Sequence, residues 1–121
     1  MVTALMVKPG EQPCMCQLVD DGDYLDCAVS VGDNLMCSAT SLKLEKGVVA
    51  IHAWEGVSLG RKGNRKIGKR IIAGTFYIVR VRDGHLQSLT EKDIVKYTLR
   101  FWEIEEYTDD ETIDSWLDGL F

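Results

Sequence analysis

The sequence predicts an α+β domain: a mostly antiparallel sheet of about five strands, with two C-terminal helices packed on one of its faces. Three observations lead to this fold class. Short runs of β-branched, aromatic and other apolar residues, separated by turn residues, recur through the first 82 positions. Two stretches with helix-start signals and helical spacing follow residue 89. The length of 121 residues, 45% of them hydrophobic and 27% charged, fits a single domain with one core over residues 1–121.

The N-terminal part is expected to contain a β-hairpin and a short helix. Apolar runs near residues 4–8 and 13–19 are typical of strands, and Pro9-Gly10 between them is a strong turn signal. Proline presets one turn dihedral, whereas glycine accepts a positive φ. After a polar break, residues 24–31 place leucine, alanine and valine at helical spacing, and Asp23 can cap a helix of one to two turns there.

A second hairpin and a long loop are expected in the middle of the chain. Strands near residues 36–44 and 48–54 flank the turn Lys46-Gly47. Residues 56–69 contain four glycines among many cations, which suit neither a helix nor a core. We therefore expect a long exposed loop there, of a length that is more often functional than incidental.

Residues 71–82 are expected to form the central strand. β-branched and aromatic residues fill its first part, which indicates burial on at least one face. Apolar and basic residues then alternate from Val79 to Arg82, as they do at a half-exposed strand end. Gly74 inside the run indicates a bulge or the close approach of another backbone.

Two helices are predicted, at residues 90–106 and 109–119. The first begins with a capping box, in which the side chains of Thr90 and Asp93 each accept a hydrogen bond from the backbone amide of the other. The second repeats this spacing at Thr108 and Glu111. The first helix also has an apolar stripe suited to packing on a sheet. The stripe comprises Ile94, Tyr97 and Phe101, with Val95, Leu99 and Trp102 beside them.

Charge is distributed unevenly along the chain, whose net charge is −5. Residues 61–70 hold six cations and no acid, whereas residues 103–118 hold eight acids and no cation. Ordinary solvated surfaces show this pattern too, but both stretches are candidate partner-binding surfaces. The candidates of the basic loop are Arg61, Lys62, Arg65, Lys66, Lys69 and Arg70. The candidates of the acidic helix are Glu105, Glu106, Asp110, Asp114 and Asp118. On the second helix, Ile113, Trp116, Leu117 and Leu120 are expected to form an apolar face separate from the acids.

The four cysteines leave three interpretations open. A structural zinc site usually has two paired knuckles, and only Cys14-Met15-Cys16 resembles one. On a strand its two sulfurs would lie on one face about 7 Å apart, so a bridging metal is conceivable. Disulfides are disfavoured in a reducing cytosol. We favour small buried thiols for Cys14, Cys16, Cys27 and Cys37, and we expect neither a metal nor a cofactor.

No residue pattern specifies a catalytic site. His52 lies in an apolar strand and His85 in a turn, and neither has a local acid, serine or cysteine partner. The glycines and cations of residues 60–66 lack the spacing of a nucleotide-binding loop and precede a strand. The cations could instead contact nucleic-acid phosphates. The net negative charge of the chain opposes this interpretation, because it repels a polyanion at long range. The acidic helix could enter a basic groove, as proteins that imitate DNA do.

Three segments together resemble a known family. They are Ala4 to Pro13, Ile71 to Val79, and Ser88 to Phe101. They are similar to a bacterial and phage family of domains of unknown function, common on phages and mobile elements of Gram-positive hosts. In that family an acidic-glycine turn and an asparagine-arginine pair precede the core strand, and Glu55-Gly56 and Asn64-Arg65 match these places here. The additional cations and the acidic helix depart from the family pattern.

The resemblance implies a mobile-element context and brings no reaction or ligand. That context favours proteins that interfere with host defences. We therefore expect a non-enzymatic protein in the cytoplasm of the bacterial host that binds a host protein or nucleoprotein. Its expected effect is to inhibit a defence complex, as anti-CRISPR and anti-restriction proteins do. The alternative is a small nucleic-acid-binding accessory protein that uses the basic loop 60–70. No membrane partner is expected, because no run approaches the ~18 consecutive apolar residues of a membrane-spanning helix. Formation of a homodimer is left open.

Overall fold

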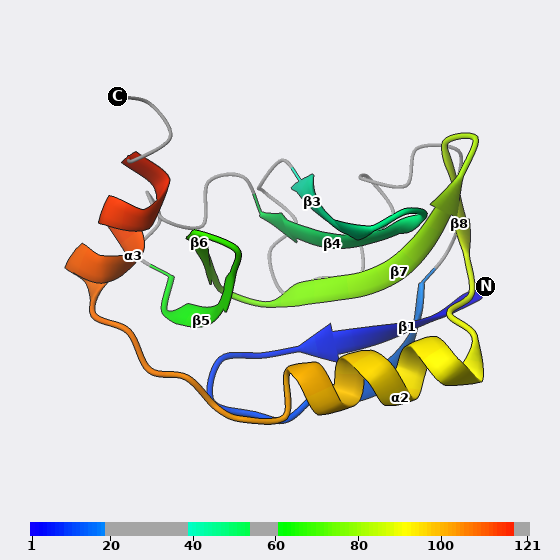
Figure 1. Ribbon diagram of the computed structural model, residues 1–121, viewed down its shortest axis with the longest axis horizontal. Helices are drawn as coiled ribbons and strands as arrows, with labels where there is room; N and C mark the ends of the chain where they lie inside the picture. The colour runs from blue at the N-terminus through cyan, green and yellow to red at the C-terminus, as the bar shows by residue number, and fades with distance from the viewer. Residues whose placement is uncertain (19–38, 54–60, 118–121) are drawn as a thin grey trace.

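A computed structural model describes residues 1–18, 39–53 and 61–117. They form a six-stranded antiparallel sheet, a separate two-stranded hairpin and two helices, which confirms the predicted α+β class (Figure 1). The strands of the large sheet are β1 (Val2–Val7), β2 (Cys14–Leu18), β3 (Ala39–Glu45), β4 (Val48–Ala53), β7 (Phe76–Arg82) and β8 (His85–Gln87). The hairpin consists of β5 (Gly63–Ile67) and β6 (Arg70–Ala73), and the helices are α2 (Glu91–Arg100) and α3 (Asp109–Leu117).

The large sheet is organised around β7. Its strand order is β2-β1-β7-β4-β3, with β8 also paired to β7, and all pairs are antiparallel. Both predicted hairpins, β1 with β2 and β3 with β4, are confirmed. A tight turn at Asp83-Gly84, with positive φ at both residues, joins β7 to β8. The short helix predicted for residues 24–31 lies outside the described residues.

The prediction of one continuous strand over residues 71–82 is wrong in one respect. The chain forms two strands there, β6 and β7, which are separated at Gly74. Gly74 has a φ of +85° and donates its backbone amide to the Lys62 carbonyl at 2.8 Å. A Cβ atom at this position would lie 3.0 Å from Cδ of Arg61. The close backbone approach predicted from this glycine is therefore confirmed, but it redirects the chain from one sheet to the other.

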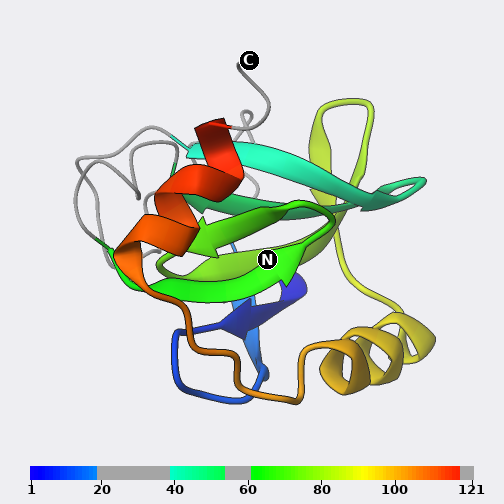
Figure 2. The ribbon, with the colours of Figure 1, turned by 60° about the vertical axis from the view of Figure 1, so that its left-hand side comes forward.

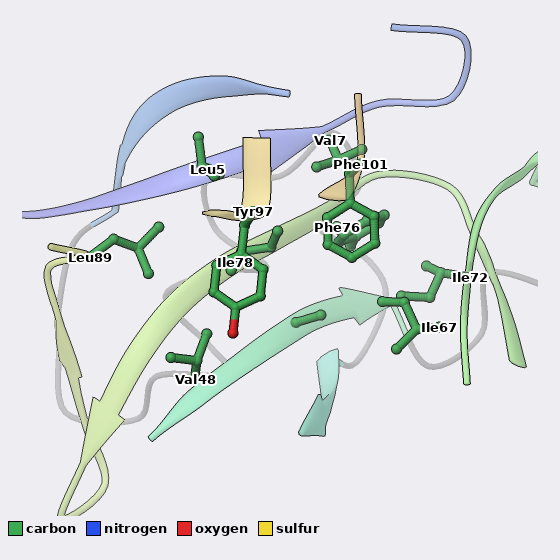
Figure 3. Close-up of a cluster of buried hydrophobic side chains, with 11 residues drawn as sticks. Leu5, Val7, Val48, Ile67, Ile72, Phe76, Ile78, Leu89, Tyr97 and Phe101 are labelled. Carbon is green, nitrogen blue, oxygen red and sulfur yellow. The ribbon is translucent and has the colours of Figure 1, made fainter. Parts of the chain in front are cut away.

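The main hydrophobic core lies between the large sheet, α2 and the β5–β6 hairpin (Figure 3). Tyr97 of α2 and Phe101, the residue that caps the helix, point into it, and the centre of the Phe101 ring lies 5.3 Å from that of Phe76 of β7 in an edge-on contact. This core comprises Leu5, Val7, Val48, Ala50, Ile67, Ile72, Phe76, Ile78, Leu89, Tyr97 and Phe101. A second cluster lies on the opposite face of the sheet. It contains Ala4, Leu18, Val49, Ile51, Tyr77, Val79 and Leu86.

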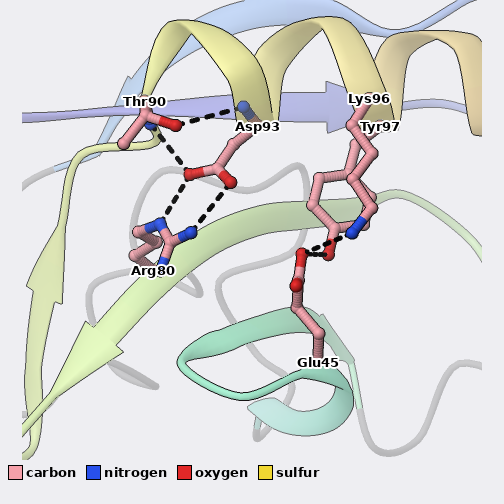
Figure 4. Close-up of polar contacts among 6 residues, drawn as sticks. All are labelled: Glu45, Arg80, Thr90, Asp93, Lys96 and Tyr97. Carbon is pink, nitrogen blue, oxygen red and sulfur yellow. Dashed lines mark hydrogen bonds and ion pairs between the residues drawn. The ribbon is translucent and has the colours of Figure 1, made fainter.

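The capping box predicted for α2 is confirmed and extends into an ion pair (Figure 4). The Thr90 hydroxyl accepts from the Asp93 amide at 3.1 Å, and Asp93 Oδ2 accepts from the Thr90 amide at 2.9 Å. Arg80 of β7 donates to both oxygens of Asp93, at 2.5 and 2.9 Å. The guanidinium, followed by the capping hydrogen bonds, lowers the pKa of Asp93 to about 2 against the cost of burial. The helix ends at Arg100, earlier than the predicted residue 106.

Helix α3 packs on the outer edge of β6 (Figure 2). The Ser115 hydroxyl accepts from the Ile71 amide at 2.9 Å, and Trp116 Nε1 donates to the Ile71 carbonyl at 2.7 Å. Two side chains of α3 thus satisfy the Ile71 amide and carbonyl, which would otherwise be open to pairing with a further strand. The Trp116 ring also lies 5.4 Å from His52 of β4, which shares a face with Val48 and Ala50 of the main core. Both helices therefore lie on the same side of the large sheet, as predicted.

Candidate partner-binding surface

The basic segment is mostly a hairpin, which corrects the prediction of a long exposed loop over residues 56–69. Residues 63–67 form β5, which pairs with β6 through a turn at Gly68, where φ is +61°. Gly63 is in close contact with the segment before α3 and with α3 itself, since a Cβ there would lie 2.6 Å from Oγ1 of Thr112. Residues 56–60 of the predicted loop lie outside the described part of the chain.

Arg65 is fully buried, so its assignment to a partner-binding surface is wrong. Its Nε and one terminal nitrogen donate to the Phe101 carbonyl at 3.1 and 2.9 Å, and the same terminal nitrogen donates to the Glu11 carbonyl at 2.8 Å. The other terminal nitrogen donates to Oδ1 of Asn64 at 2.9 Å. Burial lowers the pKa of Arg65, while the nearby Glu105 carboxyl acts in the opposite direction.

Asn64 completes a buried polar cluster with Arg65. Its Nδ2 donates to the carbonyls of Val7 at 2.8 Å and Gly74 at 2.9 Å. Together the two side chains join the ends of β1 and α2, the turn after β1 and the start of β7. The asparagine-arginine pair matched in the resembled family thus occupies a structural position here. Sequence reasoning missed the burial, although this pair was the available signal that Arg65 differs from its basic neighbours.

Three of the six basic candidates are exposed lysines: Lys62, Lys66 and Lys69. Arg61 and Arg70 are half-buried. The Arg70 guanidinium lies 4.8 Å from the centre of the Trp116 ring, a cation–π contact that holds it against α3. The basic surface is accordingly smaller than the sequence indicated, and part of it is engaged by α3.

The acidic candidates divide into inward and outward groups. Glu105 is half-buried, and its Oε1 accepts from the Lys66 amide at 3.2 Å and from the Tyr107 hydroxyl. Burial, and then the hydrogen bond to this carboxyl, raise the pKa of Tyr107 to about 12. Glu106, Asp110 and Asp114 are exposed, as is Asp109. Asp118 lies outside the described residues.

Helix α3 presents a mixed acidic and apolar face to solvent, which corrects the predicted separation of these residues. Thr112, Ser115 and Trp116 face the hairpin, whereas Ile113 and Leu117 are each 39% exposed. Successive helical residues are rotated by about 100°, so positions 110, 113, 114 and 117 fall within one side of the helix. We call Asp110, Ile113, Asp114 and Leu117 the acidic-apolar face of α3.

Helix α2 also exposes apolar side chains. Ile94, Tyr97 and Phe101 pack inward as predicted. Their neighbours Val95, Leu99 and Trp102 are instead 59%, 69% and 50% exposed. Six of the eight large exposed hydrophobic residues of the described chain therefore belong to the segment from α2 through α3: Val95, Leu99, Trp102, Ile104, Ile113 and Leu117.

The remaining histidines and cysteines of the described chain lie on different strands, with His52 on β4, His85 on β8, and Cys14 and Cys16 on β2. Across residues 1–18, 39–53 and 61–117, no group of three or more His, Cys, Asp or Glu side chains is placed to share a metal ion. His85 is the first residue of β8, opposite Arg82, rather than a turn residue. Cys14 is exposed and Cys16 half-buried, which corrects the expectation of buried thiols at Cys14. Cys27 and Cys37 lie outside the described ranges.

The chain was compared with protein-family models, curated proteins and solved structures, and none of the three comparisons found a match. The resemblance to a mobile-element family stays a prediction. Within the described ranges, no helix is long and apolar enough to cross a bilayer.

Proposed function

We propose that this chain is a phage or mobile-element protein that binds a host protein through the acidic-apolar face of α3. It acts by occupying its partner's surface rather than by catalysis. The target that suits this face is a host defence complex with a basic groove, of the kind inhibited by anti-CRISPR and anti-restriction proteins. The observation that carries the proposal is the side-by-side exposure of Ile113 and Leu117 with Asp110 and Asp114.

Apolar and acidic groups on one helix face favour a protein partner over a nucleic acid. Carboxylates repel the phosphates of a nucleic acid, whereas the lysines and arginines of a nucleic-acid-binding groove attract carboxylates. Asp110 and Asp114 are one helical turn apart, roughly 6 Å between their Cβ atoms, and neither pairs with a cation in the described part of the structure. Exposed Ile113 and Leu117 supply apolar surface that gains free energy on burial.

The rigid attachment of α3 supports its use as a binding element. The helix is fixed to β6 by the Ser115 and Trp116 hydrogen bonds, and it begins with the predicted capping box. Thr108 and Glu111 accept from each other's amides at 3.1 and 3.0 Å. A helix held in this way loses little conformational entropy when it docks, which favours affinity.

The basic hairpin is the weaker candidate surface. Arg65 is buried and Arg70 contacts Trp116, so the exposed lysines are Lys62, Lys66 and Lys69. Each phosphate contact adds to affinity and to its salt dependence, and three lysines make a small electrostatic footprint on a chain of net charge −5. We therefore treat nucleic-acid binding by this segment as the competing outcome of the test.

The test is affinity capture from lysate of a Gram-positive host, with and without nuclease, using two charge-reversed variants. Asp110→Lys/Asp114→Lys changes the proposed face, and Lys62→Glu/Lys69→Glu is the matched control on the hairpin. We expect a partner that survives nuclease, is retained by the hairpin variant and is lost with the α3 variant. Capture that depends on nucleic acid and on the lysines would instead establish the accessory-protein alternative.

Inhibition is tested separately from binding. The captured protein, once purified, is assayed for its own nucleic-acid binding or cleavage with increasing amounts of the chain. The proposal expects inhibition that competes with the nucleic acid and that the α3 variant lacks. A partner without any nucleic-acid-handling activity would contradict the defence-complex part of the proposal while leaving the binding surface in place.

A further inference from the structure

The register of β1 and β2 brings three sulfur-bearing side chains to one face of the sheet edge. Met6 lies directly opposite Cys14, and Ala4 lies opposite Cys16. Residues opposite each other on antiparallel strands share a face, as do residues two apart on one strand. Met6, Cys14 and Cys16 therefore form a triangle on the face that carries the second hydrophobic cluster, against which Met6 and Cys16 pack.

The spacing within this triangle suits a shared ligand. Opposite residues have Cβ atoms about 5 Å apart, and alternate residues of a strand lie about 7 Å apart. Ordinary rotamers can lean the two thiols toward each other, and the three rotatable bonds of Met6 let its thioether reach between them. The fourth corner is Ala4, opposite Cys16, whose methyl group is the smallest side chain of the four.

We propose that Met6, Cys14 and Cys16 form a three-sulfur site for monovalent copper. Two thiolates and a thioether are soft ligands, which select Cu(I) over harder divalent ions. Structural zinc usually needs four closed ligands, and no group of three or more His, Cys, Asp or Glu is placed for this within the described residues. The site is separate from the proposed partner-binding face and does not depend on it.

The exposed thiol gives the ion access from solvent. Cys14 is exposed and offers the first contact, whereas Cys16 is half-buried. Binding of one Cu(I) by the two thiolates releases the thiol protons to solvent and leaves a site of net charge −1.

The test is anaerobic titration of the full chain with Cu(I) buffered by bicinchoninate. We expect one tightly bound Cu(I) per chain, with three sulfur neighbours by X-ray absorption. Met6→Leu is expected to weaken binding about tenfold or more, because loss of even an outer-shell partner of a metal site commonly costs that much. Met15→Leu is the matched control, since Met15 lies between the two cysteines but on the other face, opposite Leu5.

Two results would overturn the proposal. If Met6→Leu and Met15→Leu bind Cu(I) equally well, the thioether is not a ligand. If Cys14→Ser and Cys16→Ser leave the affinity unchanged while Cys27→Ser/Cys37→Ser lowers it, the ion is held elsewhere. Urea unfolding of each variant separates ligand loss from misfolding, and the near-isosteric Met6→Leu is expected to fold.

Discussion

Replacement of Arg65 by alanine is expected to destabilise the fold more than any other single change in the hairpin. The guanidinium satisfies three acceptors: the buried Phe101 carbonyl, the buried Oδ1 of Asn64 and the partly buried Glu11 carbonyl. Each acceptor left unpaired costs roughly 1–3 kcal/mol, and the cavity adds to this. Allowing for water entry, we expect a loss of about 4 kcal/mol, a large part of the 5–15 kcal/mol that is usual for a domain.

The assay is equilibrium urea unfolding followed by tryptophan fluorescence. With a slope of about 2 kcal/mol per M, the expected loss lowers the midpoint by about 2 M. Lys66→Ala is the control, because the adjacent Lys66 side chain is exposed and its removal is expected to cost under about 0.5 kcal/mol. Arg65→Lys keeps the charge but not the planar fork, and is expected to fall between the two. Equal midpoints for Arg65→Ala and Lys66→Ala would refute the structural role of Arg65.

Three further predictions concern stability. The Asp93 side chain is 6% exposed, and its pKa falls from 3.8 to about 2 on folding. The ionised carboxylate therefore adds at most about 2 kcal/mol to the free energy of unfolding above pH 4, and this contribution is lost as the pH falls toward 2. Asp93→Asn should therefore flatten acid unfolding in that window; an unchanged profile would contradict this. Trp116→Phe removes one partly buried hydrogen bond and should cost about 1 kcal/mol in urea, whereas Trp102→Phe should cost almost nothing. Gly63→Ala should lower the thermal midpoint through its clash with Thr112 and be partly rescued by Thr112→Ala; additive losses would exclude the clash.

Local features of the fold were predictable because their causes are local. The capping boxes depend on two residues three positions apart, and both formed as expected. The turns at Lys46-Gly47 and Asp83-Gly84 likewise depend on glycine at positive φ. The amphipathic pattern of α2 predicted Tyr97 and Phe101 as its buried residues, and both are buried.

Long-range features were not predictable from the same patterns. Arg65 binds the carbonyls of Glu11 and Phe101, which are 54 and 36 residues away in the chain. Apart from the adjacent Asn64, nothing near position 65 in the sequence distinguishes this buried arginine from its solvated neighbours, because the backbone acceptors lie far along the chain. The division at Gly74 also depends on a partner from outside the strand, the Lys62 carbonyl.

The predicted separation of apolar and acidic residues on α3 failed for a different reason. Hydrophobic periodicity favours burying Ile113 and Leu117, but the surface that α3 covers includes the open edge of β6. That edge carries backbone donors and acceptors, which a polar side chain satisfies better than an aliphatic one. Ser115 and Trp116 meet this need and turn the aliphatic residues outward. The candidate site therefore results from the hydrogen-bonding needs of the β6 edge, which cannot be inferred from the hydrophobic periodicity of the sequence.

The most direct measurement is photo-crosslinking in host cells from a benzoylphenylalanine placed at position 113. Ile113 is an exposed residue of the acidic-apolar face, so Ile113→benzoylphenylalanine is expected to yield one discrete protein adduct that resists nuclease. The same group at position 69, on the hairpin, is expected to yield none. Adducts from position 69 alone, or adducts that vanish on nuclease treatment, would contradict the proposal that α3 binds a host protein.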